Sequence, residues 1–150
     1  MKARDLMTHH VRTCRVGDTL AEAARIMWEG DLGDLPVVDE EGRVVAMITD
    51  RDICMAAYTQ GVPLVASSVS SAMSKRLVSC SPHASLHEIE QKMLSAQVRR
   101  IPVIDELGLL VGIVTLGDIA RHTQSGSLLE RFGAAGVTKT LSAVSERRPN

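Results

Sequence analysis

Two short segments of the chain carry the same pair of residues able to bind a ligand, a threonine followed three positions later by an aspartate. They are Thr49 with Asp52 in "AMITDRDIC" and Thr115 with Asp118 in "GIVTLGDIA". Each pair follows an apolar run and opens a helical pattern, which predicts that the threonine starts a helix. A helix start presents free N–H groups and partial positive charge, so a phosphate can dock there beside the hydroxyl. The aspartate, one turn further on, can accept hydrogen bonds from both hydroxyls of a ribose.

A purely structural interpretation of the same pair stays open. Threonine at the N-cap with a carboxylate at the third helical position is close to a capping box. Such a cap contributes about 1 kcal/mol to helix stability and requires no ligand. A single copy of the motif therefore does not separate ligand binding from helix capping.

Apolar residues stand close to both pairs. Met47 and Ile113 each come two positions before the threonine, and Leu32 and Val98 lie on the segment before the preceding strand. Apolar side chains beside a few polar groups are typical of a ligand pocket. We expect these four residues to form the walls for an adenine ring.

The elements that must position these residues are themselves repeated. Shifting the sequence by 66 positions aligns residues 7–54 with 73–120 without a gap. Each copy is predicted to be β-α-β-β-α, which is a mixed α/β (α+β) fold. The first strands are expected at Val11–Cys14 and Leu77–Cys80, and capping boxes at Thr19 and Ser85 open the following helices.

A hairpin is predicted in the second half of each copy. The segments "LPVVDEEGRVVAMIT" and "IPVIDELGLLVGIVT" each hold two β-branched runs around a short loop. Gly42 and Gly108 in these loops indicate a left-handed turn residue. Pro36 and Pro102 stand at the strand openings, where a missing N–H is tolerated.

The repeat also predicts the domain organisation. We expect a first repeat at 1–66, a second at 67–124, and a helical tail at 125–150. One unit of this size buries little surface by itself, which favours two copies that share a face.

These doubled motifs resemble a tandem pair of CBS domains, named from cystathionine beta-synthase, over roughly residues 7–122. The resemblance implies a pseudo-twofold pair in a small stand-alone protein of bacterial type. It also implies that the cleft between the two repeats binds AMP, ADP, ATP, NAD or S-adenosylmethionine, and that the module is regulatory and often dimeric.

The two copies differ where the first hairpin strand begins. Arg99 and Arg100 occupy the places of Gly33 and Asp34. The resemblance implies that Arg100 contacts phosphate together with Thr115 and Asp118, with Arg99 as a second cationic contact. Guanidinium groups suit this role because they can meet phosphate oxygens bidentately.

The charge balance of the copies points the same way. Residues 7–54 hold five Arg or Lys against ten Asp or Glu, whereas residues 73–120 hold five against five. In the first copy Asp34 would repel phosphate, and Arg51 is the obvious compensating cation. We therefore expect the second copy to hold a phosphorylated nucleotide and the first to prefer a less anionic adenosyl ligand.

Composition argues against several other classes. With 23% charged residues, a net charge of -1 and one residue each of Trp, Tyr and Phe, the chain gives no reason to expect nucleic-acid binding. It has no signal-peptide core and no apolar run long enough for a membrane span, so a cytoplasmic location is expected. The three cysteines lack CxxC spacing and are expected to be reduced, mostly buried thiols.

Metal and catalytic sites are also not expected. His83 and His87 stand four apart, but no third ligand has matching spacing. No nucleophile motif or paired general base is present, so we predict that the protein is not an enzyme.

Two hypotheses remain. The first is a non-catalytic sensor whose adenosyl ligand changes the packing of the repeats or of a homodimer, and whose partner is a separate, unknown protein. The second is a constitutive dimeric interaction scaffold that keeps the helix caps and the core but binds no ligand.

Overall fold

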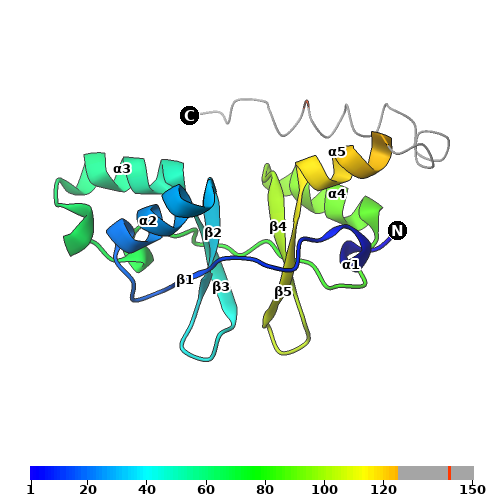
Figure 1. Cartoon of the computed structure of the whole chain (residues 1–150), viewed down its shortest axis with the longest axis horizontal. Helices are drawn as coiled ribbons and strands as arrows, with labels where there is room; N and C mark the ends of the chain where they lie inside the picture. The colour runs from blue at the N-terminus through cyan, green and yellow to red at the C-terminus, as the bar shows by residue number, and fades with distance from the viewer. Residues whose placement is uncertain (125–141, 143–150) are drawn as a thin grey trace. The chain divides into compact units, whose positions relative to one another are not determined.

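The computed structural model describes residues 1–124 and Ser142, and the predicted helical tail therefore lies almost wholly outside the described residues (Figure 1). The chain forms a mixed α+β structure with two compact units. The first-repeat unit comprises Val11–Leu77 with the hairpin tip Leu107–Leu110. Among the described residues, the second-repeat unit comprises Met1–His10, Val78–Glu106 and the chain from Val111 to the end of α5 at Gln124.

The first-repeat unit is built on a three-stranded sheet in the order β1-β2-β3. Strand β1 is parallel to β2, and β2 is antiparallel to β3. Its elements in chain order are β1 (Cys14–Arg15), α2 (Leu20–Gly30), β2 (Asp34–Val38), β3 (Val44–Thr49), α3 (Asp50–Gln60) and two short 3-10 turns, η1 (Leu64–Ala66) and η2 (Val69–Ser71).

The second-repeat unit has the same order around a two-stranded sheet, β4-β5. Its elements are α1 (Ala3–Leu6), α4 (Leu86–Ala96), β4 (Arg100–Ile104), β5 (Leu110–Thr115) and α5 (Leu116–Gln124). A single parallel bridge between Cys80 and Val103 stands where β1 stands in the first unit. The structure thus has the two repeats of strands and helices that the sequence predicts.

The first strand of each repeat is shorter than predicted. Instead of Val11–Cys14, the pairing runs only over Cys14–Arg15, and instead of Leu77–Cys80 it is one bridge at Cys80. Cys14 on β1 pairs with Val37 on β2, so Pro36 occupies the register position just before this pair. Proline has no N–H, so it cannot donate a hydrogen bond to the chain that precedes Cys14. Pro102 stands at the same place before Val103, so neither ladder extends toward the N-terminus.

Local capping fixes where the two middle helices begin and end. Thr19 Oγ1 accepts from Glu22 N at 3.1 Å, and Ser85 Oγ accepts from Glu88 N at 3.2 Å. The predicted box is only half formed at Thr19, because the Glu22 carboxylate pairs with Arg25 at 2.6 Å instead. Each helix ends at a residue with φ of 51°, Asp31 or Gln97, in the left-handed conformation that closes a helix.

The hairpins turn at the predicted glycines. Gly42 and Gly108 have φ of 80° and 82°, a conformation that L side chains adopt only with strain. The sequence prediction of a left-handed glycine in each loop is confirmed.

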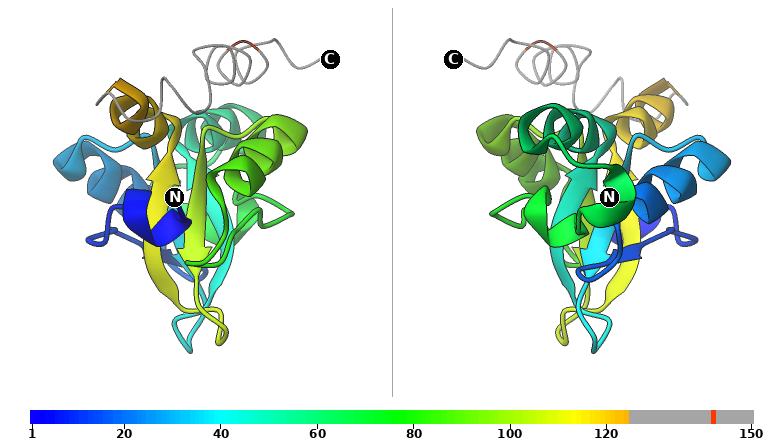
Figure 2. Two further views of the ribbon diagram at one scale, coloured as in Figure 1. Left: turned by 90° about the vertical axis from the view of Figure 1, so that its right-hand side faces the viewer. Right: turned by 90° about the vertical axis from the view of Figure 1, so that its left-hand side faces the viewer.

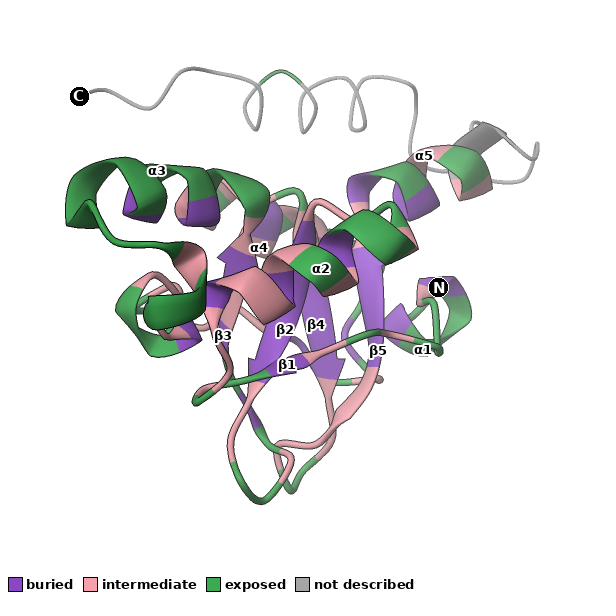
Figure 3. Cartoon of the chain, turned by 60° about the vertical axis from the view of Figure 1, so that its left-hand side comes forward, coloured by how far each residue is buried: buried purple, intermediate pink, exposed green. Residues whose placement is uncertain are grey.

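Each unit has its own hydrophobic core, drawn in purple in Figure 3. In the first-repeat unit the core includes Leu20, Leu35, Ile48 and Val69; in the second it includes Leu6, Ile89, Met93, Ile101 and Val114. Leu6 precedes the aligned segment 7–54 and Val69 precedes the aligned segment 73–120. Leu6 nevertheless lies in the core of the second-repeat unit and Val69 in that of the first, so leading segments contribute to both cores.

These leading segments are exchanged between the repeats. Thr8, at the start of the first repeat, pairs with Ile113 on β5. Figure 2 shows the N-terminal segment beside this strand. Ser74, at the start of the second repeat, accepts a 3.0 Å hydrogen bond at Oγ from the backbone N–H of Met47 on β3. Its own N–H donates to the Met47 carbonyl at 2.8 Å. The limits of the compact units are thus set by contacts and not by the order of the repeats along the chain.

No helix in the described part of the chain combines the length and apolar character needed to cross a membrane.

Candidate functional site

The first threonine–aspartate pair caps α3. Thr49 Oγ1 accepts from Asp52 N at 3.1 Å, and Asp52 Oδ2 accepts from Thr49 N at 2.9 Å. This is a complete capping box, so the structural interpretation of the motif holds for this copy. Among the described residues, the one donor to this half-buried carboxylate is Thr49 N, which bonds Oδ2.

The second pair caps α5 with a denser set of bonds. Asp118 Oδ2 accepts from Thr115 N at 2.8 Å and from the Thr115 hydroxyl at 2.6 Å, and Thr115 Oγ1 accepts from Asp118 N at 3.1 Å. The other oxygen, Oδ1, pairs with the guanidinium of Arg121 one turn along the helix. Asp118 is 6% exposed, so its carboxylate is buried and satisfied on both oxygens.

The residues before β2 and β4 lie against these helix starts. The Gly33 carbonyl accepts from Asp50 N at 3.0 Å, and the Arg99 carbonyl accepts from Leu116 N at 2.8 Å. Asp34 is the register partner of Thr49 across the sheet. Directly opposed residues in a sheet are near neighbours, so a side chain at this position stands beside the capping threonine.

The second copy places basic residues at this position. Arg100 opens β4 and is half-buried, and Arg99 is exposed beside the start of α5. The structure thus brings Arg99 to the Thr115–Asp118 turn through its backbone. Asp34 is the buried counterpart of Arg100 in the first copy, at 8% exposure.

Met47 and Ile113, two of the four predicted wall residues, lie on the strands that lead into these turns, whereas Leu32 and Val98 pack against the cores. Met47 and Thr49 alternate with the core residues Ala46 and Ile48 along β3, so they share the face turned away from the core. Ile113 stands in the same relation to Thr115, and it is 9% exposed. Leu32 and Val98 follow the helix ends, where their N–H groups donate to Met27 and Met93 carbonyls at 2.9 and 3.1 Å.

A family model for the CBS domain matches residues 3–58 and 67–125, which is most of the chain and covers both repeats. The chain belongs to the CBS domain family. The resemblance carried by the doubled Thr-x-x-Asp motif is thereby confirmed.

Relatives of similar size share most of the chain. It is 42% identical over 122 residues to the CBS domain-containing protein YhcV of Bacillus subtilis, covering 81% of this chain and 85% of that one. Among solved structures it is similar to Hypoxic Response Protein I with two coordinated zinc ions, at 38% identity and a TM-score of 0.75, covering 81% and 98% of the two chains. It is also similar to the CBS domain pair of protein MJ0100 in complex with 5-methylthioadenosine and S-adenosyl-L-methionine, at 26% identity and a TM-score of 0.74, covering 83% and 96%.

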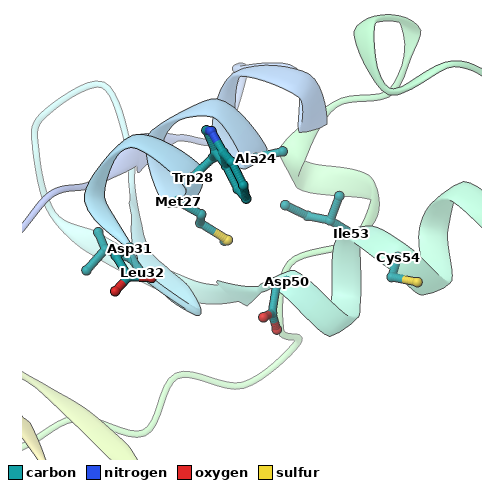
Figure 4. Close-up of a pocket in the computed structure, with 8 residues that line it drawn as sticks. All are labelled: Ala24, Met27, Trp28, Asp31, Leu32, Asp50, Ile53 and Cys54. Carbon is teal, nitrogen blue, oxygen red and sulfur yellow. The ribbon is translucent and has the colours of Figure 1, made fainter.

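In the first CBS repeat, a pocket of about 330 Å³ opens between α2 and α3 (Figure 4). Leu32 and Asp50 lie at one side of it, and Trp28 and Ile53 face it from the two helices. Trp28 is 88% exposed. Trp28 therefore lies outside the core of the first-repeat unit.

The cysteines of the CBS repeats are unpaired thiols in two environments. Cys14 and Cys80 are buried, and Cys54 is exposed at the pocket between α2 and α3. Burial raises the pKa of Cys14 to about 12, with Asp18 adding to the effect, and raises that of Cys80 to about 11. These two thiols are neutral core residues, as expected, whereas Cys54 is not buried.

No group of three or more His, Cys, Asp or Glu side chains suited to hold a metal ion occurs among the described residues. The nearest cationic side chain to a motif carboxylate is that of Arg121, which sequence reasoning missed. Its spacing of three from Asp118 on a helix was the available signal, because residues three apart share a helix face. Arg51 is exposed on the first turn of α3, where its N–H donates to Asp50 Oδ1 at 2.7 Å.

Proposed function

We propose that this CBS domain protein is a non-catalytic sensor that binds an adenosine-containing ligand and signals to a separate protein. The ligand is AMP, ADP, ATP, NAD or S-adenosylmethionine, and it binds at the N-terminal turns of α3 and α5. The observation that carries the proposal is the Thr115–Asp118 turn, where a buried carboxylate stands at a helix start beside Arg99.

Each part of that turn has a chemical role. The partial positive charge of the helix start and the arginines favour an anion. The carboxylate accepts from ribose hydroxyls, and the apolar face with Ile113 and Val98 suits a purine ring. The CBS domain pair of MJ0100, which is 26% identical to this chain, was crystallised with two adenosyl compounds, and this supports the ligand class.

The two sites are proposed to be unequal. Arg99 and Arg100 favour a phosphorylated nucleotide at α5, whereas buried Asp34 disfavours phosphate at α3 and leaves that site to a less anionic adenosyl ligand. Arg51 supplies an exposed cation at the first site.

A homodimer is part of the proposal. Trp28, Tyr58 and Met55 are 88%, 82% and 45% exposed on α2 and α3. Large exposed aromatic side chains are typical interface anchors. We expect the second copy of this chain to cover this face.

The ligand-free scaffold remains the second candidate, because both capping boxes are complete without a ligand. Calorimetric titration of the full chain with AMP, ADP, ATP, NAD and S-adenosylmethionine separates the two. The sensor requires saturable binding that is weakened by Asp118→Asn and Asp52→Asn at their respective sites. If circular dichroism shows folded protein and none of the five ligands releases heat, the scaffold is the better account.

A further inference from the structure

Arg121 lies where it can both block and complete the second site. Side chains in a helix point back toward the N-terminus, so a residue one turn after Asp118 covers the first turn of α5. Its Nη2 pairs with Asp118 Oδ1. Its Nη1 is 3.5 Å from the position that a Cβ of Gly117 would take, and the Thr115 hydroxyl is 3.6 Å from that same position.

The Asp118 carboxylate has no spare oxygen in this arrangement. Oδ2 takes two hydrogen bonds from Thr115, and Oδ1 is held by Arg121. These three donors leave one lone pair, on Oδ1, so a ribose that donates both of its hydroxyls to Asp118 has to displace the guanidinium. The Asp118 side chain is 8% exposed but that of Arg121 is 71% exposed, so the arginine can leave toward solvent while the aspartate stays.

The first copy has no equivalent ion pair at its motif carboxylate, Asp52, among the described residues. The position equivalent to Arg121 is Met55, and the position equivalent to Gly117 is Arg51. Each helix start thus has one arginine of its own, but only the one on α5 is bonded to the motif carboxylate. This difference does not involve Arg99 and Arg100, which lie just before and at the start of β4.

We propose that Arg121 sets the charge of the ligand that the second repeat accepts. In the empty site it neutralises Asp118. When a ribose takes Asp118, the released guanidinium lies over the helix start and pairs with a phosphate or carboxylate of the same ligand. A neutral adenosine has to break the ion pair without replacing it, whereas an anionic adenosyl ligand restores a partner to both groups. This inference rests on the proposed function.

The test uses the residue that the first copy provides. In an Asp52→Asn background, where only the second site keeps its carboxylate, Arg121→Met is compared with unchanged Arg121 by titration with AMP and with adenosine. Adenosine affinity should rise about two- to fivefold in Arg121→Met, because the ion pair no longer competes. AMP affinity should fall or stay level, so the preference for AMP over adenosine shrinks.

A matched exchange provides the control. Met55→Arg in an Asp118→Asn background should introduce the same preference for AMP at the first site. Arg121→Lys should keep most of the preference because it keeps the charge. Increasing salt should weaken AMP binding less in Arg121→Met than with arginine present.

The possible outcomes distinguish the role of Arg121 from the proposed sensor function. If AMP and adenosine both bind and Arg121→Met leaves the ratio of their dissociation constants unchanged, the role of Arg121 is wrong and the sensor stands. If folded wild-type protein binds none of the adenosyl ligands, both are wrong. Should the double variants unfold, Arg121→Gln alone in the wild-type chain gives the same ratio test.

Discussion

Thr8 and Ile113 exchange two backbone hydrogen bonds, from Thr8 N at 2.9 Å and from Ile113 N at 3.0 Å. The pairing attaches the first ten residues to β5 of the second-repeat unit. It also places Leu6, which is 4% exposed, in the core with Ile89 and Met93.

Leu6→Ala should therefore destabilise the second-repeat unit, although Leu6 precedes the first repeat in sequence. Truncating a buried leucine costs about 2–5 kcal/mol of unfolding free energy. Urea unfolding measures the loss, and hydrogen exchange should show faster exchange in β4 and β5. Val65→Ala is the control, because Val65 is 69% exposed. Equal effects of the two substitutions would contradict the exchange of leading segments.

Gly112→Ala tests the same attachment from the strand side. A Cβ at Gly112 would lie 2.6 Å from Met7 Sδ and 2.9 Å from the backbone oxygen of Thr8. The backbone cannot yield as a side chain can, so a loss of about 1–3 kcal/mol in unfolding free energy is expected. Gly17→Ala, with nothing within 4 Å of its Cβ, should be nearly neutral. A stable Gly112→Ala protein would show that the N-terminal segment is not held there.

Cys14 should make stability depend on alkaline pH. Burial raises its pKa from 9.0 to about 12, so the neutral thiol is favoured by the folded state. This contribution is fully present below pH 9.0 and is lost as pH rises from there toward about 12. Urea unfolding from about pH 8 to about pH 11 measures this contribution. The unfolding free energy of Cys14→Ala should fall less steeply with pH than that of the wild type. Parallel slopes would contradict a protected thiol at this position.

The same burial predicts which thiol reacts. In the native protein an alkylating reagent at neutral pH should modify Cys54, which is exposed, and spare Cys14 and Cys80. Mass spectrometry after digestion identifies the modified residue. Modification of all three at similar rates would mean that the cores open readily.

Arg100→Ala should lower the affinity for phosphorylated ligands and leave the affinity for adenosine unchanged. Loss of a charge-assisted hydrogen bond costs about 1.5–3 kcal/mol, or roughly ten- to hundredfold in affinity. Titration with AMP and adenosine measures both effects, with the exposed Arg76→Ala as control. A similar loss for both ligands would assign Arg100 to folding rather than to phosphate binding.

Trp28→Ala tests the homodimer. Trp28 is 88% exposed, so its removal should leave the unfolding free energy of the monomer nearly unchanged. As an interface anchor it should contribute at least about 2 kcal/mol to association, which is roughly thirtyfold in the dimer dissociation constant. Sedimentation velocity across a concentration series detects the shift. An unchanged distribution would exclude α2 as the centre of the interface.

The sequence by itself determined what depends on neighbours along the chain. The caps at Thr49 and Thr115 join residues three apart, and the turns at Gly42 and Gly108 follow from backbone sterics. The same locality predicted the order of helices and strands in both repeats. It failed for the first strands, where register against Pro36 and Pro102 limits the pairing.

Only the tertiary structure decided what depends on distant segments and on side-chain direction. The pairing of Thr8 with Ile113 and of Ser74 with Met47 gives each repeat a leading segment from before the other, which no local pattern encodes. The exposure of Trp28 depends on which face of α2 meets the sheet. Asp118 and Arg121 are three residues apart, which the sequence shows. An exposed arginine side chain has many solvated conformations, so the sequence does not show that its guanidinium pairs with the buried Asp118 carboxylate.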